Sequence, residues 1–251
     1  EAYYTFGNTT NESPADSGTN LYDRSTDSDQ DLAVDGATAP FAGHTIAATG
    51  AIHKTDKSVY GGSSMFFDGT DDVLRVANFE PLGNSAFTLE GWAYATKSTS
   101  NMIFSTRADS TGWGGTGSAT EWQLRMHSDN KFTWFHDDGD NTVTESSFQT
   151  YAEDRWYHFA VVKDTNQKLD IFVDGVPTGN PITDDGTYDA IKELQIGTQY
   201  TDGTGGNYFG GYLDELRIST GIARYSKSIE RFANTFVAKG DTGDAFTKLQ
   251  I

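Results

Sequence analysis

The sequence predicts an all-β fold, a two-sheet antiparallel jelly-roll sandwich. From about Ser63 onward, short segments alternate apolar and polar residues, which is the period of a half-buried strand. The segments recur every roughly 8–12 residues, and clusters of Gly, Ser and Asp separate them, as in sandwiches and barrels. No sustained helical pattern of apolar residues precedes Gly221. Sandwiches of this kind commonly reach the size of this 251-residue chain as one domain.

The strands are predicted in chain order. The stretch SMFFDGTDDVLRVA, from Ser64 to Ala77, reads as strand, turn, strand, with Asp68-Gly69 supplying the positive φ that tight hairpins need. Next, FTLEGWAYA from Phe87 to Ala95 places its apolar and small residues at odd positions. The later strands are NMIFSTR, EWQLRMH, KFTWFHD, WYHFAVVKD, LDIFVDGV, LQIGTQ and FGGYLDELRIS.

Two of these strands are predicted to pair as a hairpin. In WYHFAVVKD, we expect Trp156 and Phe159 to face the core together with the alternation that follows them. LDIFVDGV then returns as the hairpin partner, with Leu169, Ile171 and Val173 on one side. Two sheets built in this way bury their inner faces, so any function is expected on the concave sheet face or at a rim.

Charge and composition exclude several classes of protein. The chain has 36 Asp and Glu against 18 Lys and Arg, giving a formal net charge of −18. Such a surface repels phosphates, so we expect no nucleic-acid partner, and it also disfavours anionic lipids. No apolar run approaches the length of a membrane span, so no membrane insertion is expected. The lack of cysteine excludes disulfides, thiolate zinc sites, iron–sulfur clusters and cysteine nucleophiles.

The ends of the chain differ from its middle. Residues 1–240 are predicted to form a single domain that carries a long, polar, turn-rich loop at about 8–40. Residues 241–251 are predicted to be a C-terminal linker or strand leading toward a further domain, because AKGDTGDAFTKLQI resembles the opening of the next copy in tandem arrays.

The segments taken together resemble a known family. KSVYGGSSMFFDGTDD, FTLEGWAY, RWYHFAVVKD, LDIFVDGV and YFGGYLDELRISTGIARY resemble, in order and spacing, the laminin-G-like or concanavalin A-like lectin/glucanase jelly roll. The resemblance extends over residues from about 40 to 226. LDELRISTGIARYSKS in particular resembles versions of this domain in bacteriophage virion proteins, in fibres or decorations.

The resemblance implies a calcium ion, since domains of this kind often hold one. Asp16 in ADSGTN resembles the early Asp-Ser-Gly loop of the family, and Asp214 in YLDELRI matches its late acidic strand. Asn101, Gln199 and Asp202 resemble the rim at which related pentraxins and laminin-G domains bind calcium. Hard cations take such oxygen ligands. The alternative for each residue is a turn-capping or solvated side chain.

The chain is predicted not to be an enzyme, because it lacks the carboxylate motif of glycoside hydrolases. The resemblance implies that hydrolases of this fold class carry Glu-x-Asp-x-Glu or Glu-x-Asp-x-x-Glu on one strand. This chain has neither motif. Two carboxylates on different strands would be needed instead. Glu90 and Glu121 are the residues to consider.

Carbohydrate binding needs aromatic platforms beside polar groups. Trp113 lies in the glycine-rich stretch TGWGGTGS, where it serves either as a contact residue or as a plug over the sheet edge. Trp122 and Tyr200 are candidate platforms, although strand aromatics more often belong to the core. Arg107 and Arg125 are the cations nearest such a face, and they suit acidic sugars.

The sequence therefore predicts a non-enzymatic adhesion or recognition domain. Its expected partner is a carbohydrate, such as a cell-surface glycan, and neighbouring virion or tandem domains are further candidates. Its expected place is extracellular or on a virion surface. The alternative is a purely structural decoration or spacer domain of a virion, which requires no binding pocket.

Overall fold

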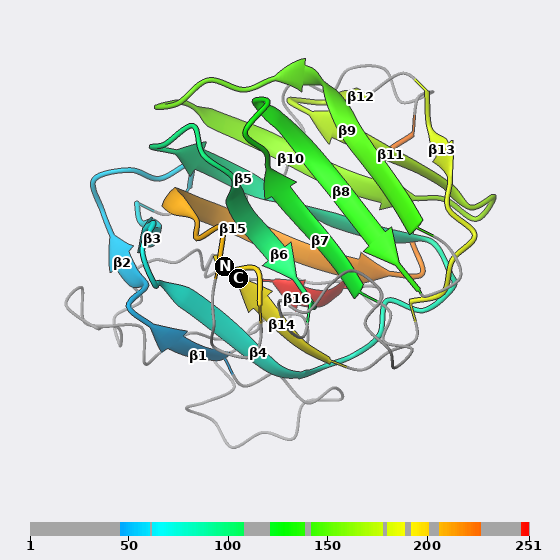
Figure 1. Ribbon diagram of the computed structural model, residues 1–251, viewed down its shortest axis with the longest axis horizontal. Helices are drawn as coiled ribbons and strands as arrows, with labels where there is room; N and C mark the ends of the chain where they lie inside the picture. Colours follow the sequence, from blue (N-terminus) through cyan, green and yellow to red (C-terminus); the bar gives the residue numbers. More distant parts are fainter. Residues whose placement is uncertain are drawn as a thin grey trace.

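The computed structural model confirms an all-β fold of two antiparallel sheets (Figure 1). It describes residues 46–60, 62–107, 121–138, 142–177, 180–188, 192–200, 206–226 and 247–250. Within these ranges the regular elements are all strands, and no helix capable of crossing a bilayer is found.

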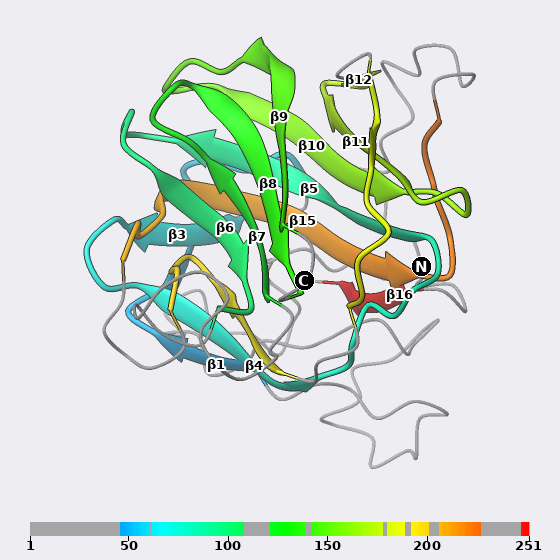
Figure 2. The ribbon, with the colours of Figure 1, turned by 45° about the vertical axis from the view of Figure 1, so that its right-hand side comes forward.

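The first layer is a seven-stranded sheet, in which sequence neighbours β6, β7, β8 and β9 form a meander. In Figure 1, β6, β7 and β8 overlie strands of the second sheet, and the turned view of Figure 2 separates the two layers. In spatial order its strands are β1 (Ile46–Thr49), β4 (Val73–Phe79), β14 (Lys192–Ile196), β6 (Asn101–Ser105), β7 (Glu121–Met126), β8 (Lys131–Asp137) and β9 (Thr142–Thr150).

The second layer is a nine-stranded sheet with β5 and β15 at its centre. Its main path runs through β12 (Val176–Pro177), β11 (Lys168–Val173), β10 (Trp156–Lys163), β5 (Phe87–Ala95), β15 (Gly210–Thr220), β3 (Ser64–Asp68) and β2 (Ile52–Lys54). Off this path, β13 (Ile182–Thr183) pairs with β11, and β16 (Thr247–Gln250) pairs with β15.

The core lies between the two sheets and is rich in aromatic rings. Phe104 of the seven-stranded sheet packs edge-on against Phe159 of the nine-stranded sheet, with ring centroids 6.2 Å apart. Phe132 also stacks on Phe159 across the sandwich. Burying such large rings stabilises a chain that is only 36% hydrophobic.

The predicted hairpin of β10 and β11 is confirmed, since Val161 pairs with Ile171 and Phe159 with Val173. Leu169 and Ile171 lie in the core, as predicted. Trp156 was assigned to the wrong face. It precedes Phe159 by three residues, an odd number, so it points away from the core and is half-buried against Tyr94 on the outer face.

The hairpin predicted at Asp68-Gly69 is also wrong. Gly69 has the expected positive φ of 85°, but β3 and β4 belong to different sheets and do not pair. The chain crosses from one layer to the other at this turn. Alternation tells which face of a strand is buried, and it does not name the neighbouring strand.

The N-terminal loop and the C-terminal linker, as bounded from the sequence, both stay predictions. The loop predicted at 8–40 lies outside the described residues. At the other end, Thr247–Gln250 forms β16, which pairs with β15 through Arg217 and Gln250. Four residues of the predicted linker thus belong to the nine-stranded sheet.

Candidate functional site

A row of polar side chains crosses the outer face of the seven-stranded sheet. Gln195 of β14 pairs with Ser105 of β6, Ser105 pairs with Gln123 of β7, and Gln123 pairs with Phe135 of β8. Paired residues share a face of the sheet. Their neighbours along the strands, such as Trp122, belong to the core, so this row points outward.

Gln123 is the unusual member of this row. It is only 1% exposed, yet neither the oxygen nor the nitrogen of its amide has a hydrogen-bond partner. Beside it, Gln195 donates from Nε2 to Glu193 Oε1, while its own oxygen has no partner. A buried amide left without partners costs about 1–3 kcal/mol, so each such group calls for an explanation.

Two arginines lie next to Gln123. The guanidinium carbon of Arg107 is 5.0 Å from the centre of the Tyr200 ring, and its Nε is 3.7 Å from Oε2 of Glu121. Arg125 follows Gln123 by two residues on the same face of β7 and is half-buried. Burial lowers the pKa of Arg125, and the charge of Arg107 lowers it further.

Three of the predicted ligand-binding residues thus gather at one place. We call this set of side chains the Gln123 patch, and it consists of Arg107, Gln123, Arg125, Phe135, Gln195 and Tyr200. The sequence did not single out Gln123, Phe135 or Gln195, because one polar residue in an alternating strand resembles any other solvent-facing position.

Trp122 is a core residue, which corrects its assignment as a sugar platform. Its ring stacks on Trp134 at 5.4 Å and meets Phe79 edge-on between the sheets. Because its ring lies in the core between the sheets, it offers no face to a ligand. Trp113 lies outside the described residues.

The predicted calcium ligands that the structure describes are engaged with the protein. Asn101 donates to the carbonyls of Lys97 and Thr99, and its side-chain oxygen accepts the N–H of Gly210. The side-chain oxygen of Gln199 accepts from Asn207. Both residues therefore cap loops at the same rim. Asp202 and Asp16 lie outside the described residues.

Asp214 is fully buried on the outer face of the nine-stranded sheet. Its carboxylate accepts the backbone N–H groups of Val59 and Tyr60, and its other oxygen accepts that of Glu215. Burial raises the pKa of Asp214 to about 7, in spite of these donors. Its oxygens hold the 59–60 segment against the sheet.

This pKa has a consequence for stability. The folded-state pKa lies above the unfolded value of 3.8, so the folded chain binds more protons and its free energy of unfolding rises as pH falls from 8 to 5. The lowered pKa of His158 acts in the opposite direction over the same range. We therefore expect that Asp214→Asn loses the part of the pH dependence of stability that Asp214 contributes. The measurement is the difference between the urea-unfolding curves of the wild type and the variant at each pH. Parallel pH profiles would contradict it.

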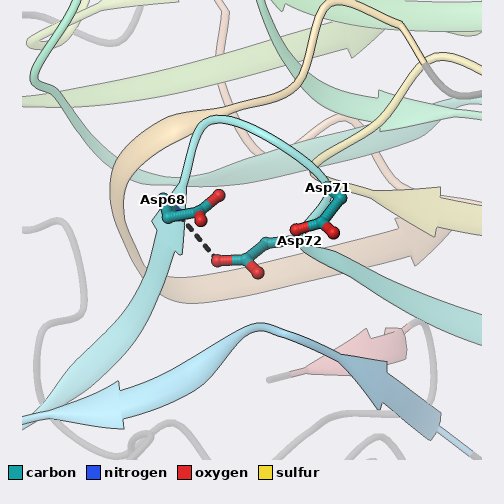
Figure 3. A group of neighbouring side chains, drawn as sticks. All are labelled: Asp68, Asp71 and Asp72. Carbon is teal, nitrogen blue, oxygen red and sulfur yellow. Dashed lines mark hydrogen bonds between the residues drawn. The ribbon is translucent and has the colours of Figure 1, made fainter.

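An acidic cluster that the sequence did not single out lies at the turn between β3 and β4. Carboxylate oxygens of Asp68, Asp71 and Asp72 lie within 4.8 Å of one another (Figure 3). One oxygen of Asp72 accepts the backbone N–H of Asp68, and Lys97 donates to the carbonyl of Gly69 in the same turn. Burial and the two neighbouring charges raise the pKa of Asp72. Three carboxylates are a suitable hard-oxygen set for a divalent cation.

The two carboxylates considered for hydrolysis lie on opposite outer faces. Glu90 is held by Arg217, with 2.7 Å between Arg217 Nε and Glu90 Oε1. Although burial alone would raise the pKa of Glu90, a hydrogen bond with His158 and the charge of Arg217 lower it to about 2. A group so acidic is a poor general acid at neutral pH. Glu121 pairs with Asp137 in the strand register and faces Arg107.

The solved structures that are similar to this chain include the following two. Domain 4 of AbnA, an extracellular GH43 arabinanase from Geobacillus stearothermophilus solved with arabinotriose, has 16% identity and a TM-score of 0.55, covering 74% of this chain and 86% of that one. Mouse laminin alpha1 domains LG4-5 have 12% identity and a TM-score of 0.48, covering 64% and 44%. No curated protein sequence matches the chain.

The family assignment comes from the sequence match. The laminin G family model described as the concanavalin A-like lectin/glucanases superfamily matches residues 68–227, which is more than half of the chain. These residues include β4 to β15, and with them most strands of both sheets and the whole Gln123 patch. The chain belongs to the concanavalin A-like lectin/glucanases superfamily.

Proposed function

We propose that this domain is a non-catalytic glycan-binding module and that the Gln123 patch is its binding site. The observation that carries the proposal is the buried, unpartnered amide of Gln123 on an outer sheet face. Sugar hydroxyls both donate and accept, so two of them satisfy both ends of one amide. The rings of Phe135 and Tyr200 supply apolar surface for the C–H face of a sugar.

The proposed setting is adhesion on the outside of a virion or cell. The similarity of LDELRISTGIARYSKS to phage virion domains supports the virion, and the arabinotriose bound to the arabinanase domain supports a sugar ligand. The competing account is a decoration or spacer domain without a ligand. A glycan array that includes arabinotriose separates the two, because a spacer binds none of its sugars.

Replacing Gln123 by methionine is expected to abolish glycan binding without loss of stability. Methionine has nearly the same volume and no amide to leave unsatisfied, so the melting temperature stays equal or rises. Titration calorimetry with the best sugar from the array measures binding, and thermal unfolding measures stability. A clear fall in melting temperature would show that the amide serves the fold, and unchanged affinity would remove Gln123 from the site.

The same protein samples test the absence of catalysis. We expect no new reducing ends when the wild-type domain is incubated with the glycan it binds. If hydrolysis does occur and Glu121→Gln or Asp137→Asn stops it, the pair facing each other on β7 and β8 is catalytic and the non-enzymatic proposal falls.

We also propose that a calcium ion binds the turn that contains Asp68, Asp71 and Asp72. Calcium would offset the repulsion among these carboxylates, which supply three of the six to eight oxygens it needs. The resemblance-based alternative of Asp16, Asp214, Asn101, Gln199 and Asp202 has its described oxygens engaged with protein N–H groups.

Calcium is therefore expected to raise the melting temperature relative to EDTA. A concentration of 100 times Kd would stabilise the fold by about 2.7 kcal/mol. Asp71→Asn should remove this shift, whereas Asp185→Asn, which changes an exposed carboxylate outside the turn, should retain it. Equal melting curves with calcium and EDTA would reject the ion, and a shift retained in Asp71→Asn would place it elsewhere.

A further inference from the structure

The charge around the Gln123 patch differs from that of the chain as a whole. The positive charge of Arg107 lowers the pKa of Arg125, and Nε of Arg107 lies 3.7 Å from Oε2 of Glu121. Among the described residues, none forms a hydrogen bond or ion pair with the guanidinium of Arg125, although the charge of Asp129 acts on it from the next turn. Within the described part of the chain, the patch thus carries a half-buried cation that no carboxylate neutralises directly.

An unpaired cation in this position calls for a partner. Two like charges that are partly removed from water destabilise each other, and a bound anion would reverse that cost. The planar guanidinium pairs with a carboxylate through two parallel hydrogen bonds. On the same face of the same strand, the amide of Gln123 offers one donor and one acceptor two residues away.

We infer that the glycan recognised by this patch contains an acidic sugar, whose carboxylate pairs with Arg125 while its hydroxyls bond to Gln123. The inference rests on the proposed glycan-binding function and names the class of sugar. The net charge of the whole chain restricts where such a glycan can bind. A net charge of −18 repels anions at long range, so an acidic glycan gains affinity only where cations such as Arg107 and Arg125 are concentrated.

The experiment compares matched acidic and neutral sugars. The probes are trigalacturonic acid against its methyl ester and sialyllactose against lactose, on an array that also carries sulfated and neutral glycans, including arabinotriose. The methyl ester keeps every sugar ring and loses only the negative charge, whereas lactose lacks the whole sialic acid residue. We expect the tightest ligands to be carboxylated, with an acidic member binding at least about tenfold more tightly than its neutral partner.

Two variants assign this preference to a residue. Arg125→Gln should reduce the affinity for the acidic sugar to that of the same variant for its neutral partner. Arg155→Gln is the matched control: Arg155 is exposed, immediately precedes β10 of the other sheet and forms an ion pair with Asp174, so its loss should change neither affinity. Both proteins are compared with the wild type by thermal unfolding, so that a folding defect is not read as lost binding.

Each remaining outcome has one meaning. Preferred binding of neutral or sulfated glycans would overturn the acidic-sugar inference and leave the glycan-binding proposal standing. Equal acidic preference in wild type and Arg125→Gln would also overturn it, because another cation would then be responsible. Failure to bind any glycan on the array would overturn the proposed function itself.

Discussion

Gly211→Ala is expected to prevent folding or to lower the free energy of unfolding by more than about 3 kcal/mol. A Cβ atom at this position would lie 1.9 Å from the backbone oxygen of Tyr94 on the neighbouring strand. The φ of 140° adds backbone strain for any residue with a side chain. Because β5 and β15 form the centre of the nine-stranded sheet, neither strand can move aside without losing ladder hydrogen bonds.

Gly83→Ala separates steric conflict from the strain of a positive φ. Gly83 has a φ of 70°, and a Cβ there meets no atom within 4 Å, so this variant should lose only about 1 kcal/mol. Urea unfolding of both variants measures the two costs. If Gly211→Ala unfolds at the same urea concentration as Gly83→Ala, the contact between the central strands is looser than described.

Glu90→Gln is expected to cost about 3–5 kcal/mol, because it leaves a buried arginine without its counter-charge. Arg217 forms its ion pair with Glu90 at 2.6 Å, and both side chains are less than 10% exposed. The Tyr225 hydroxyl also donates to Glu90, which fastens the segment after β15 to the outer face of the sheet. Glu153→Gln, at an exposed position, should change stability by less than about 0.5 kcal/mol.

The pH dependence of this loss provides an independent check. The folded-state pKa of Glu90 is about 2 and its unfolded value is 4.5, so the stabilisation is complete above 4.5 and disappears as pH falls through 2. The difference between wild type and Glu90→Gln should therefore shrink between pH 5 and pH 2. A constant difference across that range would mean that the lost hydrogen bonds, and not the charge, carry the effect. A double variant, Glu90→Leu with Arg217→Met, should recover stability relative to Glu90→Gln.

Faces of strands could be predicted from the sequence, and pairing partners mostly could not. The alternation in residues 87–95 correctly assigns Phe87, Leu89 and Ala93 to the core. It does not show that β5 pairs with β15, more than a hundred residues later, since pairing over such a distance leaves no local pattern. Asp174-Gly175, unlike Asp68-Gly69, does form the turn of a two-residue hairpin, because Val173 and Val176 pair directly across it.

The candidate site was predictable only in part for a similar reason. Arg107, Arg125 and Tyr200 were identified by residue type, and the structure brings them together. Gln123 becomes notable only through its burial and its unpaired amide, which no sequence pattern reports. Asp68, Asp71 and Asp72 lie together at the turn where the chain crosses from one sheet to the other. The sequence did not indicate this arrangement, because the same turn was predicted to be a hairpin.

The strand order also determines when the protein can fold during synthesis. β15 lies between β5 and β3, and β14 lies between β4 and β6, so the last long strands to leave the ribosome fill the middle of both sheets. Until residue 220 has emerged, the earlier strands present unpaired edges that are prone to aggregation. The sandwich therefore cannot complete its sheets before β15 has emerged, and its folding is expected to be slow, as for other topologies dominated by distant contacts.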